Sequence, residues 1–298
     1  MEIILGKTAG FCYGVKNAVS NAEEVLKKYK EITCLGELVH NGQVVKKLEN
    51  LGLKVIDKIE DAESKVIVRA HGIAKDVYSK AKKLNIKVFD YTCPKVLKIH
   101  DIAEEYAKKG YFIFFIGGRN HPESIGTISF CGKNSYLIED KEEIEDAINM
   151  LKKSEIKKLL VIVQTTFSLE KFNQYVSQIE ENIPQNVKIE IKNTICNATK
   201  IRQEETEKIS KEVDCMIIIG GKNSSNTKKL YEIANKNCKN TFIIETKDEI
   251  EEEKIQCFSK IGVMAGASTP EESIDEVIKK IEKKDEFENV RICTLARS

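Results

Sequence analysis

The chain has 298 residues, of which 41% are apolar and 32% are charged. This length and composition are typical of a soluble globular protein with two or three domains, and they exclude an intrinsically disordered chain. The 48 basic and 47 acidic residues nearly cancel. The global positive field of many nucleic-acid-binding proteins is therefore absent, and we expect no nucleic-acid partner.

The sequence shows no export signal and no membrane segment. The longest apolar run, residues 111–116, is far shorter than the roughly 20 residues that cross a bilayer. The first residues, MEIILGKTAGFC, lack the basic start and long apolar stretch of a signal peptide. We therefore expect a cytoplasmic protein with no membrane partner, in which the nine cysteines stay reduced.

Predicted helices and strands alternate along the first part of the chain. The apolar run 32–38 predicts a strand leading into His40-Asn41-Gly42, and the run 66–68 predicts one ending in Arg69-Ala70-His71-Gly72. Before them, a helix is predicted after Cys12, where apolar residues recur at helical spacing: Val15, Ala18, Val19, Ala22, Val25, Leu26 and Tyr29.

The same order of elements recurs twice more. After Cys93, Pro94 occupies a favoured first helical position, and Gly110 ends the predicted helix. The strands predicted at 111–116 and 159–163 lead into His121-Pro122-Glu123 and Gln164-Thr165-Thr166. After Cys196, the strands predicted at 215–219 and 261–264 lead into Ser224-Ser225-Asn226 and Ala265-Gly266-Ala267-Ser268.

A fixed spacing relates these three parts of the chain. The residues 28 positions after Cys12, Cys93 and Cys196 are His40, His121 and Ser224. The motif at 117–120 recurs at 220–223, and Thr165 corresponds to Ser268. Matching motifs at a fixed period indicate repeated structural units. We predict three α/β repeats at residues 1–93, 94–195 and 196–298, the first with the N-terminal strand and the third with the C-terminal tail.

The order of elements predicts an α/β fold with parallel sheets. Continuous apolar strands that alternate with amphipathic helices are typical of sheets covered on both faces. In such sheets ligands bind beyond the carboxyl ends of the strands, and all the polar motifs lie there. We expect three lobes related by a pseudo-threefold axis, which would bring one cysteine from each lobe to a common centre.

Three cysteines at equivalent helix starts indicate a shared metal site. Without the repeat, Cys12, Cys93 and Cys196 would be interpreted as helix-start thiols of slightly lowered pKa that bind nothing. Thiolate ligands select zinc, copper or iron-sulfur clusters. A four-iron cluster on three cysteines keeps one iron open for substrate, whereas zinc would take a water as its fourth ligand. The spacing alone leaves both alternatives open.

The other six cysteines are expected to be buried or structural. The repeat places Cys34 and Cys215 opposite phenylalanines, which are core residues. Cys293 aligns with Glu190 and is expected inside a strand, away from the metal site. The whole set is Cys34, Cys131, Cys215, Cys238, Cys257 and Cys293.

The polar residues at the strand ends predict an anion site. Histidine cations, hydroxyls, an amide side chain and N–H groups beside glycines can together hold a diphosphate. No P-loop motif is present, which argues against nucleoside triphosphate chemistry. His100 is expected on the surface or in packing. The residues expected around the anion are His40, His71, His121, Ser224, Ser225, Asn226 and Ser268.

Glu123 is the only carboxylate in the three triplets, and its counterparts are Gly42 and Asn226. One interpretation is a local cap or an ion pair with Arg119. A carboxylate that faces a metal site is more often a proton donor or a metal ligand.

At these residues the sequence resembles the 4-hydroxy-3-methylbut-2-enyl diphosphate reductase family of the non-mevalonate isoprenoid pathway. The resemblance spans essentially the whole chain. Each motif is weak alone, but their order is highly specific. The motifs are Gly10-Phe11-Cys12-Tyr13-Gly14-Val15, Glu37-Leu38-Val39-His40-Asn41, Ala70-His71-Gly72, Thr92-Cys93-Pro94, Gly117 through Glu123, Gln164-Thr165-Thr166, Thr194-Ile195-Cys196-Asn197-Ala198-Thr199, Ser224-Ser225-Asn226 and Ala267-Ser268-Thr269-Pro270.

The resemblance implies one 4Fe-4S cluster with three protein cysteine ligands, Cys12, Cys93 and Cys196. Its open apical iron would take the allylic hydroxyl of the substrate. Two electrons, from ferredoxin or flavodoxin, and protons would remove that hydroxyl as water, giving isopentenyl and dimethylallyl diphosphates. The diphosphate-binding residues of the family map onto the seven residues named above. Thr165 maps onto a residue near the substrate hydroxyl, and Glu123 onto the residue that relays protons.

Two alternatives remain open from the sequence. Quinolinate synthase also combines a three-cysteine cluster with three lobes, but it should lack this ordered set of histidines, serines and asparagine. A non-catalytic zinc-binding protein would be colourless and would show no turnover.

Overall fold

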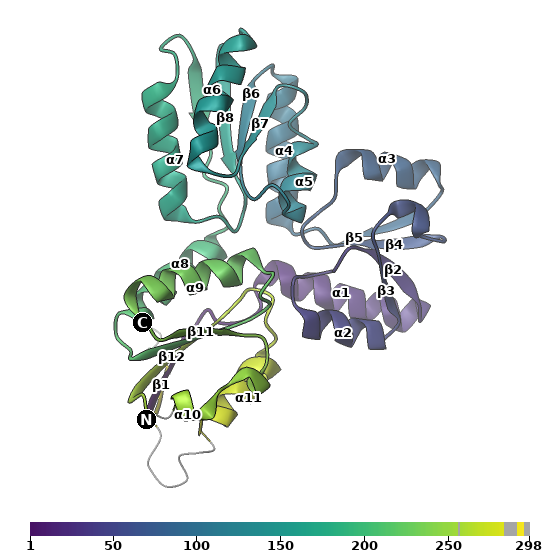
Figure 1. Cartoon of the computed structure of the whole chain (residues 1–298). Helices are drawn as coiled ribbons and strands as arrows, with labels where there is room; N and C mark the ends of the chain where they lie inside the picture. The colour runs from purple at the N-terminus through teal and green to yellow at the C-terminus, as the bar shows by residue number, and fades with distance from the viewer. Residues whose placement is uncertain (256, 283–290, 295–298) are drawn as a thin grey trace. The chain divides into compact units, whose positions relative to one another are not determined.

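The computed structural model describes residues 1–255, 257–282 and 291–294, which form three β-sheets with helices packed on their faces (Figure 1). The strand orders are β3-β2-β4-β5, β7-β6-β8-β9 and β11-β10-β12-β1-β13. Every pairing of neighbouring strands is parallel. The predicted α/β fold with three parallel sheets is confirmed.

The predicted apolar runs all become strands. The strands are β1 (Glu2–Leu5), β2 (Ile32–Leu35), β3 (Leu53–Ile56), β4 (Lys65–Val68), β5 (Lys87–Asp90), β6 (Phe112–Ile116), β7 (Ser135–Ile138), β8 (Lys158–Val163), β9 (Lys188–Ile191), β10 (Cys215–Ile219), β11 (Thr241–Ile244), β12 (Lys260–Ala265) and β13 (Arg291–Thr294).

The helices lie between these strands in the chain. The α-helices are α1 (Tyr13–Tyr29), α2 (Gly42–Asn50), α3 (Lys75–Lys83), α4 (Pro94–Lys108), α5 (Pro122–Ile128), α6 (Ile144–Lys153), α7 (Leu169–Asn182), α8 (Asn197–Ser210), α9 (Ser225–Asn237), α10 (Glu252–Ile255) and α11 (Glu271–Glu282). As predicted, Pro94 opens α4, and Gly110 follows that helix with φ +76°.

The N-terminal strand belongs to the third sheet. We expected it with the first repeat, but β1 pairs with β12 on one side and β13 on the other. Strand β1 thus occupies the place beside β12 that β5 occupies beside β4 and β9 beside β8. Cys293 lies in strand β13, as predicted, but the strand equivalent to β9 is β1, so the alignment of Cys293 with Glu190 is wrong.

Helices cover both faces of the second sheet. In β6, Phe112, Phe114 and Ile116 pack with residues of α6 and α7, whereas Ile113 and Phe115 pack with residues of α4 (Figure 1). The third sheet has the same construction, with α11 on one face and α8 and α9 on the other. Successive residues of a strand point to opposite faces, so a sheet buried on both sides requires unbroken apolar strands.

The chain divides into two compact units. The first consists of Met1–Lys16, Val39–Lys47 and Asn197–Ser298, and the second of Asn17–Leu38 and Leu48–Cys196. The third sheet belongs to the first unit, and the other two sheets to the second. The pseudo-threefold arrangement and the repeat boundaries stay predictions. Within the described residues, no helix combines the length and the apolar character that crossing a membrane requires.

Candidate active site

Each predicted ligand cysteine lies in a segment that joins a strand to a helix. Cys12 follows β1 and precedes α1, Cys93 follows β5 and precedes α4, and Cys196 follows β9 and precedes α8. All three side chains are partly exposed, and none of the eight cysteines whose side chains are described forms a disulfide.

The backbones of these cysteines are held in the same way. Each cysteine N–H donates to a carbonyl two residues beyond the end of the neighbouring strand β12, β4 or β8. The repeat read from the sequence therefore extends to the hydrogen bonds of the backbone. The three bonds are Cys12 to Ala267 at 3.1 Å, Cys93 to Ala70 at 3.0 Å and Cys196 to Thr165 at 2.9 Å.

Most of the other cysteines are core residues, as predicted. Burial raises the pKa of Cys34, Cys131 and Cys215 to about 12. A thiol of such pKa stays protonated near neutral pH and is a poor metal ligand. Cys238 is also buried, whereas Cys257, in the turn after α10, is exposed.

The donor set fits a soft metal centre. Cys12, Cys93 and Cys196 combine an unbridged thiol with partial exposure and a backbone fixed by a hydrogen bond. Thiolates of this kind bind zinc or iron-sulfur clusters, and the oxygen ligands that calcium and magnesium prefer are absent from these three positions.

In the first unit, His40 lies against the loops of the third sheet. The hydroxyl of Ser268 donates to the carbonyl of His40 at 3.0 Å. A Cβ atom on Gly221 would lie 2.6 Å from the same carbonyl oxygen, so only glycine allows this approach. His40 therefore meets Ser268 and the loop that leads from β10 to the third predicted triplet within this unit.

The third triplet opens helix α9. Ser224 is the N-cap of this helix, and its hydroxyl accepts a hydrogen bond from the N–H of Thr227 at 3.3 Å. Asn226 is 3% exposed, and both polar atoms of its amide have no hydrogen-bond partner among the described residues. An unpaired buried amide costs free energy, which indicates that a ligand or water completes this site.

In the second unit, His71 and His121 lie together. Their rings meet edge to face with centroids 5.5 Å apart. His121 is the N-cap of α5, and its Nδ1 accepts a hydrogen bond from the N–H of Glu123 at 3.1 Å. The accepting Nδ1 carries no proton, so in this arrangement His121 is a neutral imidazole whose Nε2 donates, in place of the expected cation.

Glu123 and Thr165 form a buried hydrogen-bonded pair. The N–H of Thr165 donates to Oε1 of Glu123 at 2.7 Å, and the Thr165 hydroxyl to Oε2 at 2.6 Å. Glu123 is 1% exposed. Burial raises its pKa from 4.5 to about 7, and the two bonds from Thr165 oppose that rise. A carboxyl group with this pKa can donate a proton near neutral pH.

The alternative role of Glu123 as an ion-pair partner is wrong. Arg119 binds the carboxylates of Glu143 and Glu139 instead. Glu123 occupies the second position of α5, but its carboxylate points away from its own helix to Thr165 in another loop. The carboxylate of Glu123 therefore does not cap its own helix.

Gln164 was not among the predicted site residues, but its amide joins two loops of the site. Oε1 accepts from the N–H of Gly118 at 3.0 Å, and Nε2 donates to the hydroxyl of Thr166 at 3.0 Å. It thus ties the loop that leads to His121 to the loop of Thr165. Its position directly after β8 was the available signal.

His100 is a packing residue, one of the two roles expected for it. Its ring is 3% exposed and stacks on Phe130 at a centroid distance of 4.3 Å. Neither ring nitrogen has a hydrogen-bond partner in the described part of the chain. Burial lowers its pKa to about 4, so the ring is neutral near pH 7.

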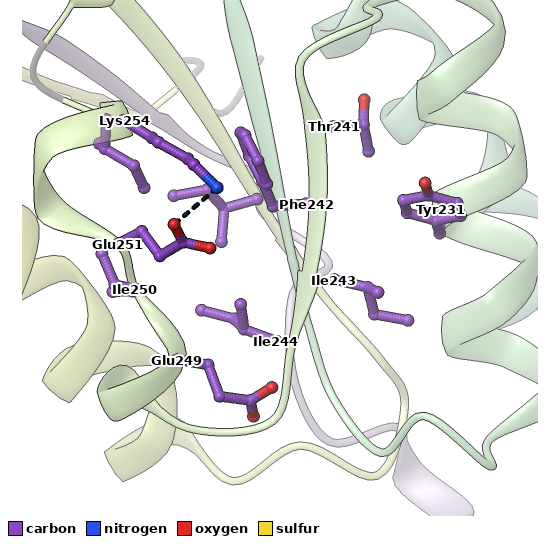
Figure 2. A pocket seen from close by; sticks show the side chains of 11 residues that line it. Tyr231, Thr241, Phe242, Ile243, Ile244, Glu249, Ile250, Glu251 and Lys254 are labelled. Carbon is purple, nitrogen blue, oxygen red and sulfur yellow. Dashed lines mark ion pairs between the residues drawn. The ribbon is translucent and has the colours of Figure 1, made fainter.

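A cavity of about 350 Å³ lies beside the edge strand β11, separate from the predicted site residues. Figure 2 shows Phe242 and Ile244 on the side of the strand where Lys254 pairs with Glu251 at 2.6 Å. Five of its eleven lining residues are isoleucines, and the lining includes none of the predicted site residues. The cavity therefore contains none of the thiols or histidines that the expected chemistry requires.

The fold and these residues define an α/β enzyme with thiols, polar side chains and a buried acid beyond the ends of parallel strands. The family model described as LytB protein matches residues 3–282, and the chain belongs to this family. A relative from Caldanaerobacter subterraneus subsp. tengcongensis, named 4-hydroxy-3-methylbut-2-enyl diphosphate reductase, is 43% identical over 297 residues, covering 97% of this chain and 100% of the relative.

Two solved structures are similar over nearly the whole chain. The first is described as (E)-4-hydroxy-3-methyl-but-2-enyl diphosphate reductase, the terminal enzyme of the non-mevalonate pathway. It is 38% identical with a TM-score of 0.69, covering 95% of this chain and 99% of its own. The second is the E-1-hydroxy-2-methyl-but-2-enyl-4-diphosphate reductase from Plasmodium falciparum. It is 29% identical with a TM-score of 0.89, covering 99% of this chain and 92% of its own.

Proposed function

We propose that this chain reduces (E)-4-hydroxy-3-methylbut-2-enyl diphosphate to isopentenyl and dimethylallyl diphosphates, the last step of the non-mevalonate pathway. Full-length similarity to reductases of that name supports the reaction. The observation that carries it within this chain is the Glu123–Thr165 pair, a buried acid in contact with the residue whose carbonyl accepts from Cys196. Acid and metal ligand are thus joined through one residue.

The electron chemistry requires a redox group, and the thiols supply its ligands. We assign Cys12, Cys93 and Cys196 as the three ligands of a 4Fe-4S cluster. When bound, this cluster would pass electrons to the substrate and hold its hydroxyl oxygen. Ferredoxin or flavodoxin would deliver the electrons. Zinc, which has no redox chemistry in proteins, would fit the same thiols but not this reaction.

The diphosphate would bind to seven polar side chains: His40, His71, His121, Ser224, Ser225, Asn226 and Ser268. Asn226 supports this assignment best, because its buried amide lacks any partner among the described residues. His121 would donate through Nε2, since its Nδ1 accepts from the backbone. Hydrogen bonds to phosphate oxygens are charge-assisted, so each can contribute about 1.5–3 kcal/mol.

Loss of the hydroxyl needs a proton, because hydroxide is a poor leaving group. Glu123 would supply this proton through Thr165. When Glu123 is protonated, Oε2–H can donate to the Thr165 hydroxyl, which lies 2.6 Å away and can pass its own proton to the substrate oxygen. In total, two electrons and two protons convert the allylic alcohol to an alkene and water, and the carboxylate is then reprotonated from solvent.

Anaerobic purification, iron and sulfide analysis, and a turnover assay on the diphosphate substrate test this proposal. We expect about four irons per chain, a brown chromophore and formation of both products. Turnover of a different substrate by the same cluster would instead favour an enzyme such as quinolinate synthase. A colourless zinc protein without turnover would contradict the proposal entirely.

A further inference from the structure

Helix α8 holds the loop that precedes Cys12. Glu205 accepts hydrogen bonds from the N–H of Lys7 at 2.8 Å and from the N–H of Thr8 at 2.9 Å. It also accepts a bond from the Thr8 hydroxyl. One carboxylate on α8 therefore binds three donors of the loop between β1 and α1.

Arg202, one helical turn earlier, holds the other side of the same loop. Its Nε donates to the carbonyl of Thr8 at 2.9 Å, and another guanidinium nitrogen donates to the carbonyl of Gly10 at 2.9 Å. The side chain is only 3% exposed. A buried guanidinium that donates to backbone carbonyls fixes the path of the chain, because its planar group of N–H donors can bind two carbonyl oxygens at once.

The loops of the other two cysteines are held by side chains much closer to them in sequence. Before Cys93, the N–H of Thr92 donates to Asp90, two residues away, at 3.0 Å. Before Cys196, the N–H of Ile195 donates to the side chain of Asn193 at 3.0 Å. The Cys12 loop instead depends on side chains 192–198 residues distant in sequence.

The loop before Cys12 has particular need of such support. Seven residues separate the end of β1 from α1, and Gly10 adopts φ +97°, a conformation open mainly to glycine. Backbone bonds join Gly6 to Val263 and Cys12 to Ala267 at the two ends of the loop. Between them, the side chains of α8 provide most of the described side-chain hydrogen bonds to this loop. The helix that begins one residue after Cys196 therefore also fixes the segment of Cys12.

We infer that Arg202 and Glu205 are positioning residues for Cys12 and set how firmly this ligand holds its metal centre. The inference rests on the proposed function, because it assumes that Cys12 is a cluster ligand. Neither residue would touch the substrate. Their loss should therefore loosen the Cys12 loop and speed loss of iron, while turnover per intact cluster stays near that of the wild type.

The test compares the anaerobically purified holoprotein with Arg202→Met, Arg202→Lys and Glu205→Ala. Peptide-level hydrogen exchange reports the loop at residues 7–12, and iron release to a chelator reports the ligand. We expect exchange and iron release to rise about tenfold or more in Arg202→Met and Glu205→Ala, since local opening governs both. Arg202→Lys keeps the charge but not the fork, and should fall between.

Two control variants make the result specific. Lys211→Met, one residue beyond the end of α8, removes an exposed partner of Glu207 and should change neither quantity. Asp90→Asn should raise exchange near Cys93 and leave residues 7–12 unchanged. If Arg202→Met does not fold, Glu205→Ala decides the question alone, because that side chain is partly exposed on a helix surface.

Wild-type exchange and iron release in Glu205→Ala and in any folded Arg202 variant would overturn the inference. Faster exchange without faster iron release would also overturn it, because the loop would then move without affecting the ligand. A wild-type protein without iron would instead contradict the proposed function, and the exchange comparison would still show whether α8 holds the loop.

Discussion

Glu123 is the residue whose replacement best separates catalysis from binding. Glu123→Gln keeps the size of the side chain and a hydrogen bond to Thr165, but removes the proton that it can transfer. We expect an intact cluster, near-normal substrate KM and a kcat lowered about 10²–10⁴-fold, the usual range for a lost general acid. Steady-state kinetics beside the cluster absorbance would check this, and retention of most turnover would show that the proton arrives by another route.

The pKa of Glu123 also predicts how activity depends on pH. Burial raises this pKa to about 7, so the acid form declines as pH rises through 7. We expect kcat/KM to fall about tenfold per pH unit above that value, since it reports the free enzyme. The bound diphosphate is negative and raises the pKa further, so kcat should fall only at higher pH. A kcat/KM that stays level to pH 9 would contradict the role of Glu123.

His100 predicts a second pH effect, on stability. In the folded protein the pKa of His100 is about 4, below its ordinary value of 6.5. Between these two pH values the unfolded chain therefore binds a proton at this residue and the folded chain does not. The free energy of unfolding is therefore unaffected by this residue above pH 6.5. It decreases as pH falls toward 4, by about 3 kcal/mol at most. In His100→Leu this dependence should disappear, and urea unfolding at pH 7 and pH 5 would show it. An equal slope in both proteins would contradict the prediction.

At the scale of single residues, the sequence predicted which residues belong to the site but not what surrounds each side chain. Motif order and spacing predicted that Cys34 and Cys215 differ from Cys12, because core positions show in the apolar pattern. The sequence could not show that His121 accepts a bond at Nδ1, nor that Asn226 is buried without a partner. Those properties depend on contacts between segments far apart in the chain.

At the scale of elements, apolar periodicity predicted the strands well and their neighbours poorly. The runs at 111–116 and 215–219 match β6 and β10 closely, because strands covered on both faces are apolar throughout. The placement of β1 between β12 and β13 was missed, since a four-residue strand carries no mark of the sheet it joins. For the same reason the hold of α8 on the Cys12 loop could not be foreseen.

At the scale of the whole molecule, the N-terminal strand completes a pattern that the other two sheets show. In the first sheet β5 leads to Cys93 and in the second sheet β9 leads to Cys196, and in the third sheet β1 leads to Cys12 from the equivalent position beside β12. The segment of Cys12 therefore needs both ends of the chain folded together. The three predicted ligands therefore lie in equivalent loops, but the side chains that hold each loop differ.

Exchange of cysteine for serine tests the ligand set across the whole chain. Cys12→Ser, Cys93→Ser and Cys196→Ser should each abolish or severely weaken the brown chromophore, because a hard hydroxyl replaces a soft thiolate. Cys293→Ser should keep it, since Cys293 lies in β13, beyond β1 in the third sheet and not in a loop equivalent to the other three. Iron analysis and absorbance after anaerobic purification would measure both outcomes. Cluster loss in Cys293→Ser would mean a fourth thiolate ligand, which would leave no iron open for the substrate hydroxyl.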